Sequence, residues 1–362
     1  MKKMTTKESI LLSLKSSSDF VSGESLAESC AISRTSVWKA IKSLESDGYK
    51  IEAISNRGYR LISSPDIIDG AYIAQKIAAL GVTAGNVTAF SELDSTLSES
   101  KRQCAEVTTF RTADGTLTPE GARLHRSVIV AGKQTAGRGR MGRPFMSPPD
   151  SGIYFTLIYA PKNGVTNPAL LTAVAAVAVS RAVDELFDTH AQIKWVNDVF
   201  LGGKKICGIL TEGVANFETG RIEAANVGIG INVRNMGFTG ELAKIAGSIQ
   251  EAAPDKEKAT GVSRNNLVAH VAAHLLRFYD AWENGDKTAL DDCLSEYRRR
   301  SLVIGKTVTI NPAAGLQGET YSATVVDIAN DASLVIKCAD GTEKKLQSGE
   351  VSLHSGQFGF PS

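Results

Sequence analysis

The chain of 362 residues is 43% hydrophobic and 22% charged, and its formal net charge is +1. These values are ordinary for a folded protein of two or three domains, and they exclude a long disordered chain. The five cysteines are far apart and form no Cys-x-x-Cys pair, which argues against a disulfide framework and favours the cytoplasm. We recognise no signal peptide and no apolar run of the roughly 20 residues needed to cross a bilayer, so we expect no membrane partner.

We predict a DNA-binding module over residues 1–63. Three short helices, at 7–16, 23–30 and 34–47, precede two strands joined by a basic turn at 55–58. This order is typical of a winged helix-turn-helix, whose recognition helix enters the major groove.

The third helix of this module carries short polar and basic side chains on the face opposite its apolar stripe. Such side chains read base edges and bind phosphates. We predict DNA contacts for Ser33, Arg34, Thr35, Ser36, Lys39, Lys42 and Arg57. One module binds weakly, so we expect a homodimer on an operator DNA with two-fold symmetry. A helical module that binds another protein is the alternative interpretation.

Residues 64–300 alternate helices with strands, and the run 168–187 is an apolar helix rich in alanine and valine. This pattern predicts an α+β domain with a mixed sheet. Within it, residues 131–143 form a loop in which glycine alternates with arginine directly after a strand-like run. Glycine lets the backbone approach a ligand and arginine supplies positive charge, so the loop is suited to hold an anion. Its spacing is neither that of a P-loop nor that of a dinucleotide-binding fingerprint, and a solvated basic turn is the alternative.

Two further segments of this domain carry motifs. Residues 193–198 are expected to be strand-like and to carry Lys194, and a Gly202-Gly203 turn then forms a β-hairpin. Residues 226–233 place glycines at alternate positions of a strand, where a ligand or another backbone often approaches closely.

Together these motifs resemble those of the biotin protein ligases, and specifically the bifunctional class that also represses the biotin operon. The resemblance covers nearly the whole chain, and the order and spacing of its motifs are specific. The matching segments are Asp94-Ser95-Thr96, Gln134 with Gly137-Arg138-Gly139-Arg140 and Gly142-Arg143, Ser147-Pro148, Lys194-Trp195, Asn197-Asp198, Gly208-Ile209-Leu210 with Glu212, and Gly228, Gly230, Ile231 and Asn232. Leu97, Val196 and Phe145 depart from the family, which usually has asparagine, proline and tryptophan there.

The resemblance implies a biotin–[acetyl-CoA-carboxylase] ligase that uses ATP to form biotinyl-5′-AMP. It then transfers biotin to a lysine of the biotin carboxyl carrier protein, and it also acts as a biotin-responsive repressor. Both chemical steps need positive charge rather than a covalent nucleophile, so Lys194 and Arg140 are expected as catalytic residues. The expected biotin-binding residues are Ser95, Thr96, Gln134, Gly137, Arg138, Arg140, Lys194 and Gly230. The expected adenylate-binding residues are Arg138, Arg140, Arg143, Lys194, Asn197 and Asn232.

ATP, Mg²⁺ and biotin are the small molecules that this activity requires. Asn197 and Asp198 are expected either to orient Mg²⁺ and Lys194 or to have a structural role at a strand end. No metal site built from protein ligands is predicted. His270 and His274 have the i,i+4 spacing of a helix, but Val271 replaces the glutamate of a zinc-protease motif. We therefore interpret the two histidines as packing or surface residues.

Residues 301–356 contain five short strands separated by turns, which predicts an SH3-like β-barrel. The stretch 107–126 is polar and rich in turn residues, and we expect an exposed loop or hairpin there. Two alternative functions stay open: a regulator that senses biotin without ligating it, and a lipoate-type ligase on the related fold.

Overall fold

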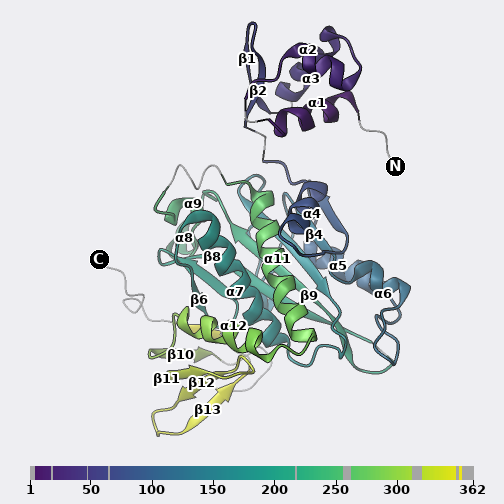
Figure 1. The fold of residues 1–362 in the computed structure, drawn as a ribbon. Coiled ribbons are helices and arrows are strands. Elements are labelled where there is room, and N and C mark those ends of the chain that lie inside the picture. Colours follow the sequence, from purple (N-terminus) through teal and green to yellow (C-terminus); the bar gives the residue numbers. More distant parts are fainter. Residues whose placement is uncertain are drawn as a thin grey trace. The chain divides into compact units, whose positions relative to one another are not determined.

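The computed structural model describes residues 5–17, 19–46, 48–63, 66–216, 218–255, 262–311, 320–347 and 350–352. Ser64 and Pro65, at the start of the predicted 64–300 domain, and the last residues of the predicted 301–356 module lie outside this set. The chain divides into two compact units, Met1–Ile67 and Ile68–Ser362, which are considered separately (Figure 1). Among the described residues, no helix combines the length and apolarity that crossing a bilayer requires.

The first unit is a three-helix module with a β-hairpin. Its elements are α1 (Thr6–Lys15), α2 (Gly23–Cys30), α3 (Arg34–Ser46), β1 (Lys50–Ile54) and β2 (Gly58–Ser63). Helix α2 ends at Ala31, whose φ of 52° is left-handed, and Ser33 then begins α3 by accepting a hydrogen bond from the Ser36 amide at 3.2 Å. The strands β1 and β2 pair antiparallel. The predicted order of helices and hairpin is therefore confirmed.

The core of this unit is formed where the apolar stripes of the three helices meet. Ile10, Leu26, Val37, Ile41 and Leu44 are each at most 1% exposed. The last three are spaced four and three residues apart, so they lie on one side of α3 and leave its other side to solvent.

The second unit is built on a seven-stranded mixed sheet, as predicted. In spatial order the strands are β3 (Val87–Phe90), β4 (Val128–Ala131), β5 (Gly152–Tyr159), β9 (Ile222–Asn232), β8 (Lys204–Ala215), β7 (Asp198–Leu201) and β6 (Gln192–Lys194). Only β3 and β4 pair in parallel. The predicted hairpin through Gly202-Gly203 joins β7 to β8 and is confirmed.

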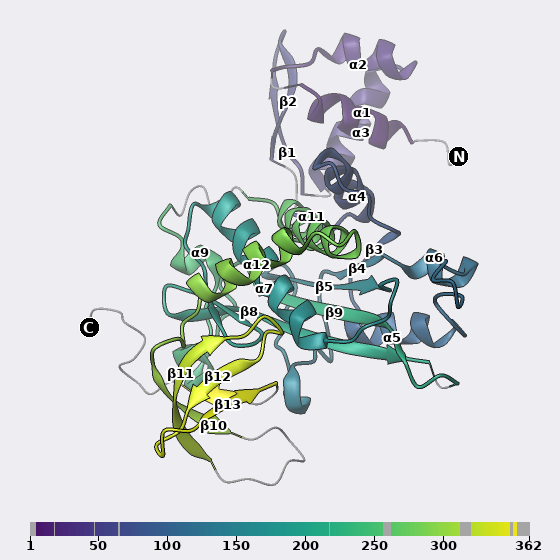
Figure 2. The ribbon, with the colours of Figure 1, turned by 60° about the horizontal axis from the view of Figure 1, so that its bottom comes forward.

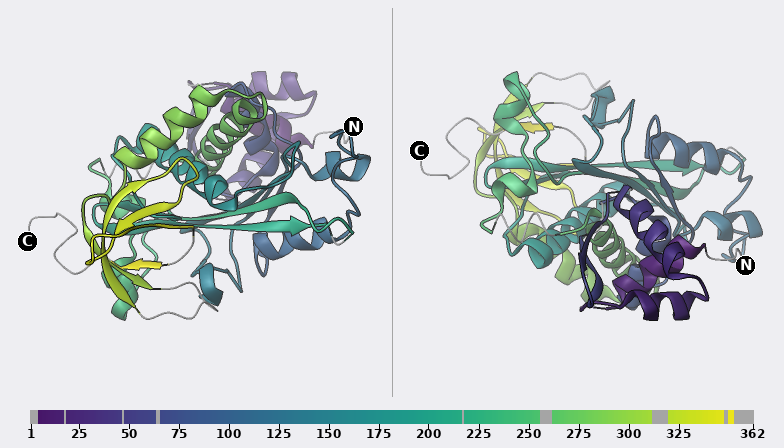
Figure 3. Two further views of the ribbon diagram at one scale, coloured as in Figure 1. Left: turned by 90° about the horizontal axis from the view of Figure 1, so that it is seen from below. Right: turned by 90° about the horizontal axis from the view of Figure 1, so that it is seen from above.

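Helices cover both faces of this sheet. The described helices of this unit are α4 (Gly70–Ala79), α5 (Thr96–Ala105), α6 (Pro119–Leu124), α7 (Pro168–Phe187), α8 (Gly240–Ile245), α9 (Ile249–Ala252), α11 (Arg264–Glu283) and α12 (Lys287–Arg299). Helices α7 and α11 lie together on one face, and α5 lies on the other (Figures 2 and 3). Helix α7 is apolar almost all round because α11, α12 and the sheet surround it.

Two predictions for this unit are wrong in part. Residues 193–198 do not form one strand: β6 ends at Lys194, the chain turns, and β7 starts at Asp198, which pairs with Lys194. The stretch 107–126 is not wholly an exposed loop or hairpin: Arg111 and Leu117 do form an antiparallel bridge, but the stretch also contains α6 and buries Phe110 and Leu124. Local composition cannot show these long-range contacts.

A five-stranded antiparallel sheet follows α12. Its spatial order is β13 (Glu343–Leu346), β12 (Leu334–Lys337), β11 (Tyr321–Ile328), β10 (Thr307–Asn311) and β14 (Glu350–Ser352). The two edge strands do not pair with each other within the described residues, so the structure shows a sheet rather than a closed barrel. The Trp195 indole donates a hydrogen bond to the Ala332 carbonyl at 2.8 Å, which ties this sheet to the turn after β6.

Candidate active site and DNA-binding helix

A cavity of about 630 Å³ opens on the sheet of the second unit, beside the face that α5 covers. Its lining comes from the start of α5, the loop after β4, the turn after β6, β8, the second half of β9, α8 and Val351 of β14. It contains every residue that the sequence predicts to bind biotin or adenylate: Ser95, Thr96, Gln134, Gly137, Arg138, Arg140, Arg143, Lys194, Asn197, Gly230 and Asn232. Ser95 and Asn232, which are 137 residues apart in the chain, therefore meet at one site.

One end of the cavity is a network of neutral polar groups. Ser95 is the N-cap of α5, and the Thr96 amide donates a hydrogen bond to Gln134 Oε1 at 2.8 Å. Gln134 Nε2 in turn donates to Ser147 Oγ at 2.9 Å. Because Ser95 and Thr96 are at most 3% exposed, these groups are held in place before any ligand arrives. Such an end suits a neutral ligand group that both donates and accepts hydrogen bonds.

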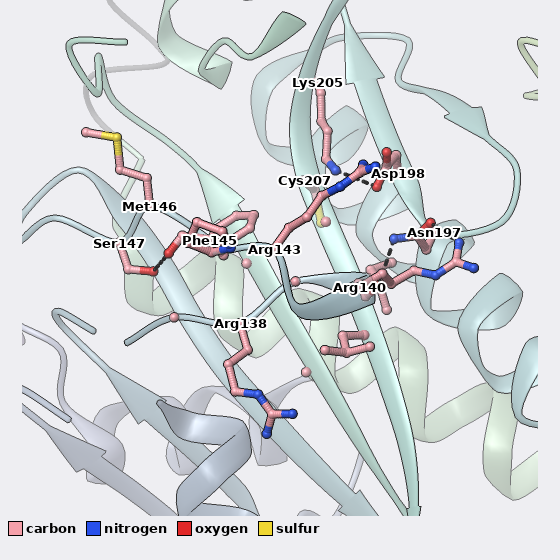
Figure 4. A pocket seen from close by; sticks show the side chains of 18 of the residues that line it. Arg138, Arg140, Arg143, Phe145, Met146, Ser147, Asn197, Asp198, Lys205 and Cys207 are labelled. Carbon is pink, nitrogen blue, oxygen red and sulfur yellow. Dashed lines mark hydrogen bonds and ion pairs between the residues drawn. The ribbon is translucent and has the colours of Figure 1, made fainter. Parts of the chain in front are cut away.

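The loop after β4 supplies the positive charge predicted for it. A short 3-10 turn, Arg140–Gly142, folds this loop over the cavity, where Arg140 donates a hydrogen bond to Asn197 Oδ1 at 3.0 Å. Arg140 and Arg143 point toward Asn197 and Asp198, whereas Arg138 points the other way and pairs with Glu212 at 3.1 Å (Figure 4).

Gly137 has a steric role in this loop. A Cβ atom at this position would lie 2.4 Å from the Phe145 carbonyl oxygen and 2.6 Å from Ser147 Oγ. Only glycine at position 137 therefore lets this part of the loop pass so close to residues 145–147 of the same loop.

The floor of the cavity is flat because two glycines face each other across neighbouring strands. Gly208 of β8 pairs with Gly230 of β9, and the Phe145 ring lies over both. A Cβ atom at Gly230 would come within 2.5 Å of that ring. The alternating glycines of 226–233 thus mark a close approach, as expected, although here the approaching group is an aromatic side chain of the protein.

Lysine residues lie at the end of the cavity near β6 and β7. Lys194 is the last residue of β6, and its register with Asp198 fixes it at the turn. Lys205 forms an ion pair with Asp198 at 2.7 Å, so Asp198 is held by a protein cation. Lys205 was not among the predicted site residues, although it lies three residues before the Gly208 motif.

Two buried groups near these lysines define what the cavity can do. Asn232 donates a hydrogen bond to the Gly247 carbonyl at 3.0 Å, while its side-chain oxygen is buried and has no partner among the described residues. That oxygen is available to accept a hydrogen bond from a ligand. Burial raises the pKa of the Cys207 thiol, so Cys207 stays protonated and is unsuited to act as a nucleophile. The cavity therefore offers cations and hydrogen-bonding groups, and its cysteine is unsuited to covalent catalysis.

In the first unit, α3 exposes the residues predicted to contact DNA. Arg34, Thr35, Lys39 and Lys42 are exposed and Ser36 is half-buried. Some of the positive charges have acidic neighbours: Arg34 pairs with Glu24 at 2.9 Å, Lys42 with Glu45 at 2.7 Å, and Arg57 of the hairpin turn with Asp19 at 3.6 Å. These pairs are solvent-exposed and weak enough for phosphate to replace the carboxylates.

Trp38 was not among the predicted DNA-contact residues, but it is 52% exposed on the same side of α3. It lies four residues from both Arg34 and Lys42, so the three residues form one row along the helix. An exposed indole at this place is available to contact a partner of α3.

The fold and the cavity define a ligase of the biotin and lipoate class joined to a helix-turn-helix module. Three family models match the chain in this order: HTH domain over residues 6–60, biotin/lipoate A/B protein ligase family over 118–232, and biotin protein ligase C-terminal domain over 303–354.

Comparison with whole proteins identifies the family within that class. The chain is 30% identical to the bifunctional ligase/repressor BirA of Bacillus subtilis, over 98% of this chain and 100% of the relative. It is 23% identical to the Escherichia coli protein of the same description, over 96% of this chain and 97% of the relative. The chain therefore belongs to the bifunctional biotin ligase/repressor family.

Solved structures agree on the fold. Biotin protein ligase from Aquifex aeolicus in complex with biotin and ATP matches with a TM-score of 0.52 at 24% identity, covering 73% of this chain and 97% of that one.

Proposed function

We propose that this protein is a biotin–[acetyl-CoA-carboxylase] ligase that also represses transcription. In the first reaction the biotin carboxylate attacks the α-phosphate of ATP, which forms biotinyl-5′-AMP and releases pyrophosphate. In the second, a lysine amine of the biotin carboxyl carrier protein attacks the mixed anhydride, and AMP leaves. The observation that carries this proposal is the cavity in which the hydrogen-bonding end, the arginine loop and Lys194 converge.

Biotin has a neutral ureido ring at one end and a carboxylate at the other, and the cavity has matching ends. We assign the ring to the network of Ser95, Thr96 and Gln134, whose hydrogen bonds already fix the orientation of each group. Gly230 would leave room for the aliphatic chain once the Phe145 ring moves aside, and we assign Gly137 to the biotin site because it lets its loop pack closely against Gln134 and Ser147. A site built on such hydrogen bonds discriminates against acids that cannot make them, lipoate included.

The carboxylate of biotin then lies toward the cationic end. We assign to Lys194 the role of bridging this carboxylate and the α-phosphate, where it offsets the repulsion between two anions. Arg140 and Arg143 would surround the phosphates, and Arg138 would join them only after its ion pair with Glu212 opens. Arg140, already held by Asn197, would keep the reactive adenylate in the cavity. The free side-chain oxygen of Asn232 would accept a hydrogen bond from the nucleotide.

Magnesium would accompany ATP and shield its phosphates. Asn197 and Asp198 carry the only two oxygen-bearing side chains of the β6–β7 turn, and Asp198 is close enough to the cationic end to contribute one oxygen ligand. Its ion pair with Lys205 would have to open first, so we assign the remaining ligands to the nucleotide and water.

For the repressor activity we assign operator contacts to Ser33, Arg34, Thr35, Ser36, Lys39 and Lys42 of the α3 region and to Arg57 of the hairpin turn. A homodimer that forms when the adenylate is bound would place two copies of α3 on a two-fold operator. We further infer that the C-terminal sheet closes into an SH3-like barrel, that the domains are 1–63, 64–300 and 301–356, and that the protein works in the cytoplasm.

Biotinylation of a purified biotin carboxyl carrier protein, followed by intact mass spectrometry, tests the ligase proposal. We expect one biotin per carrier, dependent on ATP and Mg²⁺, and no modification when lipoate replaces biotin. An unmodified carrier in the presence of bound biotin would instead favour the regulator that senses biotin without ligating it.

A further inference from the structure

Two histidines and a glutamate converge on the outer side of the helical layer of the second unit. His270 and His274 lie one turn apart on α11, and Glu185 lies near the end of α7, which packs alongside α11 (Figure 1). Glu185 Oε2 is 2.9 Å from His274 Nε2 and 3.3 Å from His270 Nδ1. None of the three residues lines the active-site cavity.

The geometry of this cluster is that of a chelate. Residues four apart on a helix project side by side, so both imidazoles reach the same point from one rigid element. One ligand atom from each of the three side chains lies within 4.8 Å of the other two. In a tetrahedral zinc site the ligand atoms are about 3.3 Å apart, as bond lengths of about 2.0–2.1 Å require. Small side-chain rotations are sufficient to reach that spacing.

We propose that His270, His274 and Glu185 bind one zinc-class divalent cation, with water in the remaining position. Two imidazole nitrogens and one carboxylate oxygen are a donor set for Zn²⁺, Ni²⁺, Co²⁺ or Cu²⁺, whereas Mg²⁺ prefers oxygen alone. The Glu185 side chain is 47% exposed, which leaves the fourth position open to solvent. The site is therefore chemically distinct from any Mg²⁺ that accompanies ATP.

Two arginines near the cluster oppose the binding of a cation there. Arg181 and Arg277 are close enough to His274 to disfavour added positive charge. Arg181, however, donates two hydrogen bonds to Glu296, at 2.8 and 2.6 Å, and its guanidinium lies over the Phe278 ring. Arg277 donates to the Leu80 carbonyl. Since both guanidiniums are engaged elsewhere, they lower the affinity for a cation without occupying the site.

Metal binding here would have a structural consequence. The ion would join α7 to α11, and these two helices cover one face of the sheet whose other face carries the active-site cavity. Because the ligands are brought together only by folding, a bound ion stabilises the folded state. We therefore expect zinc to raise the melting temperature without being required for ligation.

Calorimetric titration of metal-free, full-length protein with Zn²⁺ tests the proposal. We expect one equivalent to bind, and excess Mg²⁺ should not compete. His270→Gln, His274→Gln and Glu185→Gln should each weaken this binding by about tenfold or more, together with the gain in melting temperature. His190→Gln is the matched control, because His190 is an exposed histidine outside the cluster and its loss should change neither quantity.

Carrier biotinylation by each variant shows that it is folded, because none of the substituted residues belongs to the active site. The double variant His270→Gln/His274→Gln decides the outcome if the single variants retain partial binding. Unchanged zinc affinity in the double variant, or no zinc binding by the unmodified protein, would overturn the proposal.

Discussion

At the scale of single residues, the active site depends on the position of Lys194 at the end of β6 and on two glycines that have no side chain. Lys194 is positioned by the end of β6 and its register with Asp198, so its place does not depend on a mobile loop. Gly137 and Gly230 act through the space they leave, since a Cβ atom at either one would collide with a neighbour. Charge and space can therefore be tested separately.

Replacing Lys194 with alanine removes the cation assigned to both transition states. We expect the rate of adenylate formation to fall by about 10²-fold or more, with an unchanged melting temperature. Rapid-quench measurement of biotinyl-5′-AMP checks this, and Lys287→Ala, at an exposed lysine in the first turn of α12, is the control. Normal turnover in Lys194→Ala would refute the assigned role.

Replacing Gly137 with alanine tests the role of space. The added methyl must displace Ser147 or the Phe145 backbone, and with Ser147 the Gln134 side chain that it holds. We expect KM for biotin to rise by about tenfold or more while KM for ATP changes less. Ala78→Ser, at an exposed residue of α4 outside the cavity, should have no effect on either constant. Equal increases in both constants would show that the loop as a whole has moved.

His125 provides a prediction for pH. Its Nδ1 accepts a hydrogen bond from the Ala160 amide, and burial, helped by Arg111 and Arg126 and opposed by Asp280, lowers the pKa of His125 from 6.5 to about 4. The folded protein thus binds this proton less readily than the unfolded chain, so the stabilisation is complete above pH 6.5 and is lost as the pH falls toward 4.

Melting temperatures measured between pH 7 and 4 check this. Between pH 7 and pH 4 the melting temperature of the unmodified protein should fall by a few degrees more than that of His125→Gln. The variant should already have the lower melting temperature at pH 7. His190→Gln should follow the unmodified protein, and parallel curves for all three would contradict the assignment.

At the scale of secondary-structure elements, the recognition helix shows how far a sequence pattern reaches. The apolar spacing of Val37, Ile41 and Leu44 predicts which side of α3 is buried, and hence which side is free for DNA. It does not show that Arg34 and Lys42 pair with acids, or that Trp38 stays exposed between them. Those features depend on neighbouring elements.

The double variant Arg34→Ala/Lys39→Ala tests this helix as a DNA-binding element. Loss of two phosphate contacts should weaken operator binding and reduce the slope of log K against log salt by about 2. Carrier biotinylation should be unchanged. Lys7→Ala/Lys15→Ala removes the same charge from α1 of the same module. It should weaken operator binding less than Arg34→Ala/Lys39→Ala does. Comparable losses in the two variants would mean that only the net charge of the module matters.

At the scale of the whole molecule, the sequence predicted which segments belong to the site better than how they meet. The glycine-arginine loop, the Lys194 segment and the alternating glycines are each local patterns, and all three line one cavity. The turn between β6 and β7 was missed because a run of apolar residues with one lysine looks the same whether the chain continues or reverses.

Contacts between distant segments account for the other omissions. Nothing in the spacing of His270 and His274 indicates that Glu185, on another helix 85 residues earlier, completes their cluster. Phe145 fills the floor above Gly208 and Gly230 for the same reason. Periodicity reports which side of an element is buried, and not which residue of another element lies opposite.

Biotin-dependent exchange of pyrophosphate into ATP by the purified protein tests the central claim most directly. We expect exchange with biotin, none with lipoate, and loss of exchange in Lys194→Ala. Absence of exchange with biotin, from protein that binds biotin, would contradict the ligase function and leave a biotin-sensing repressor.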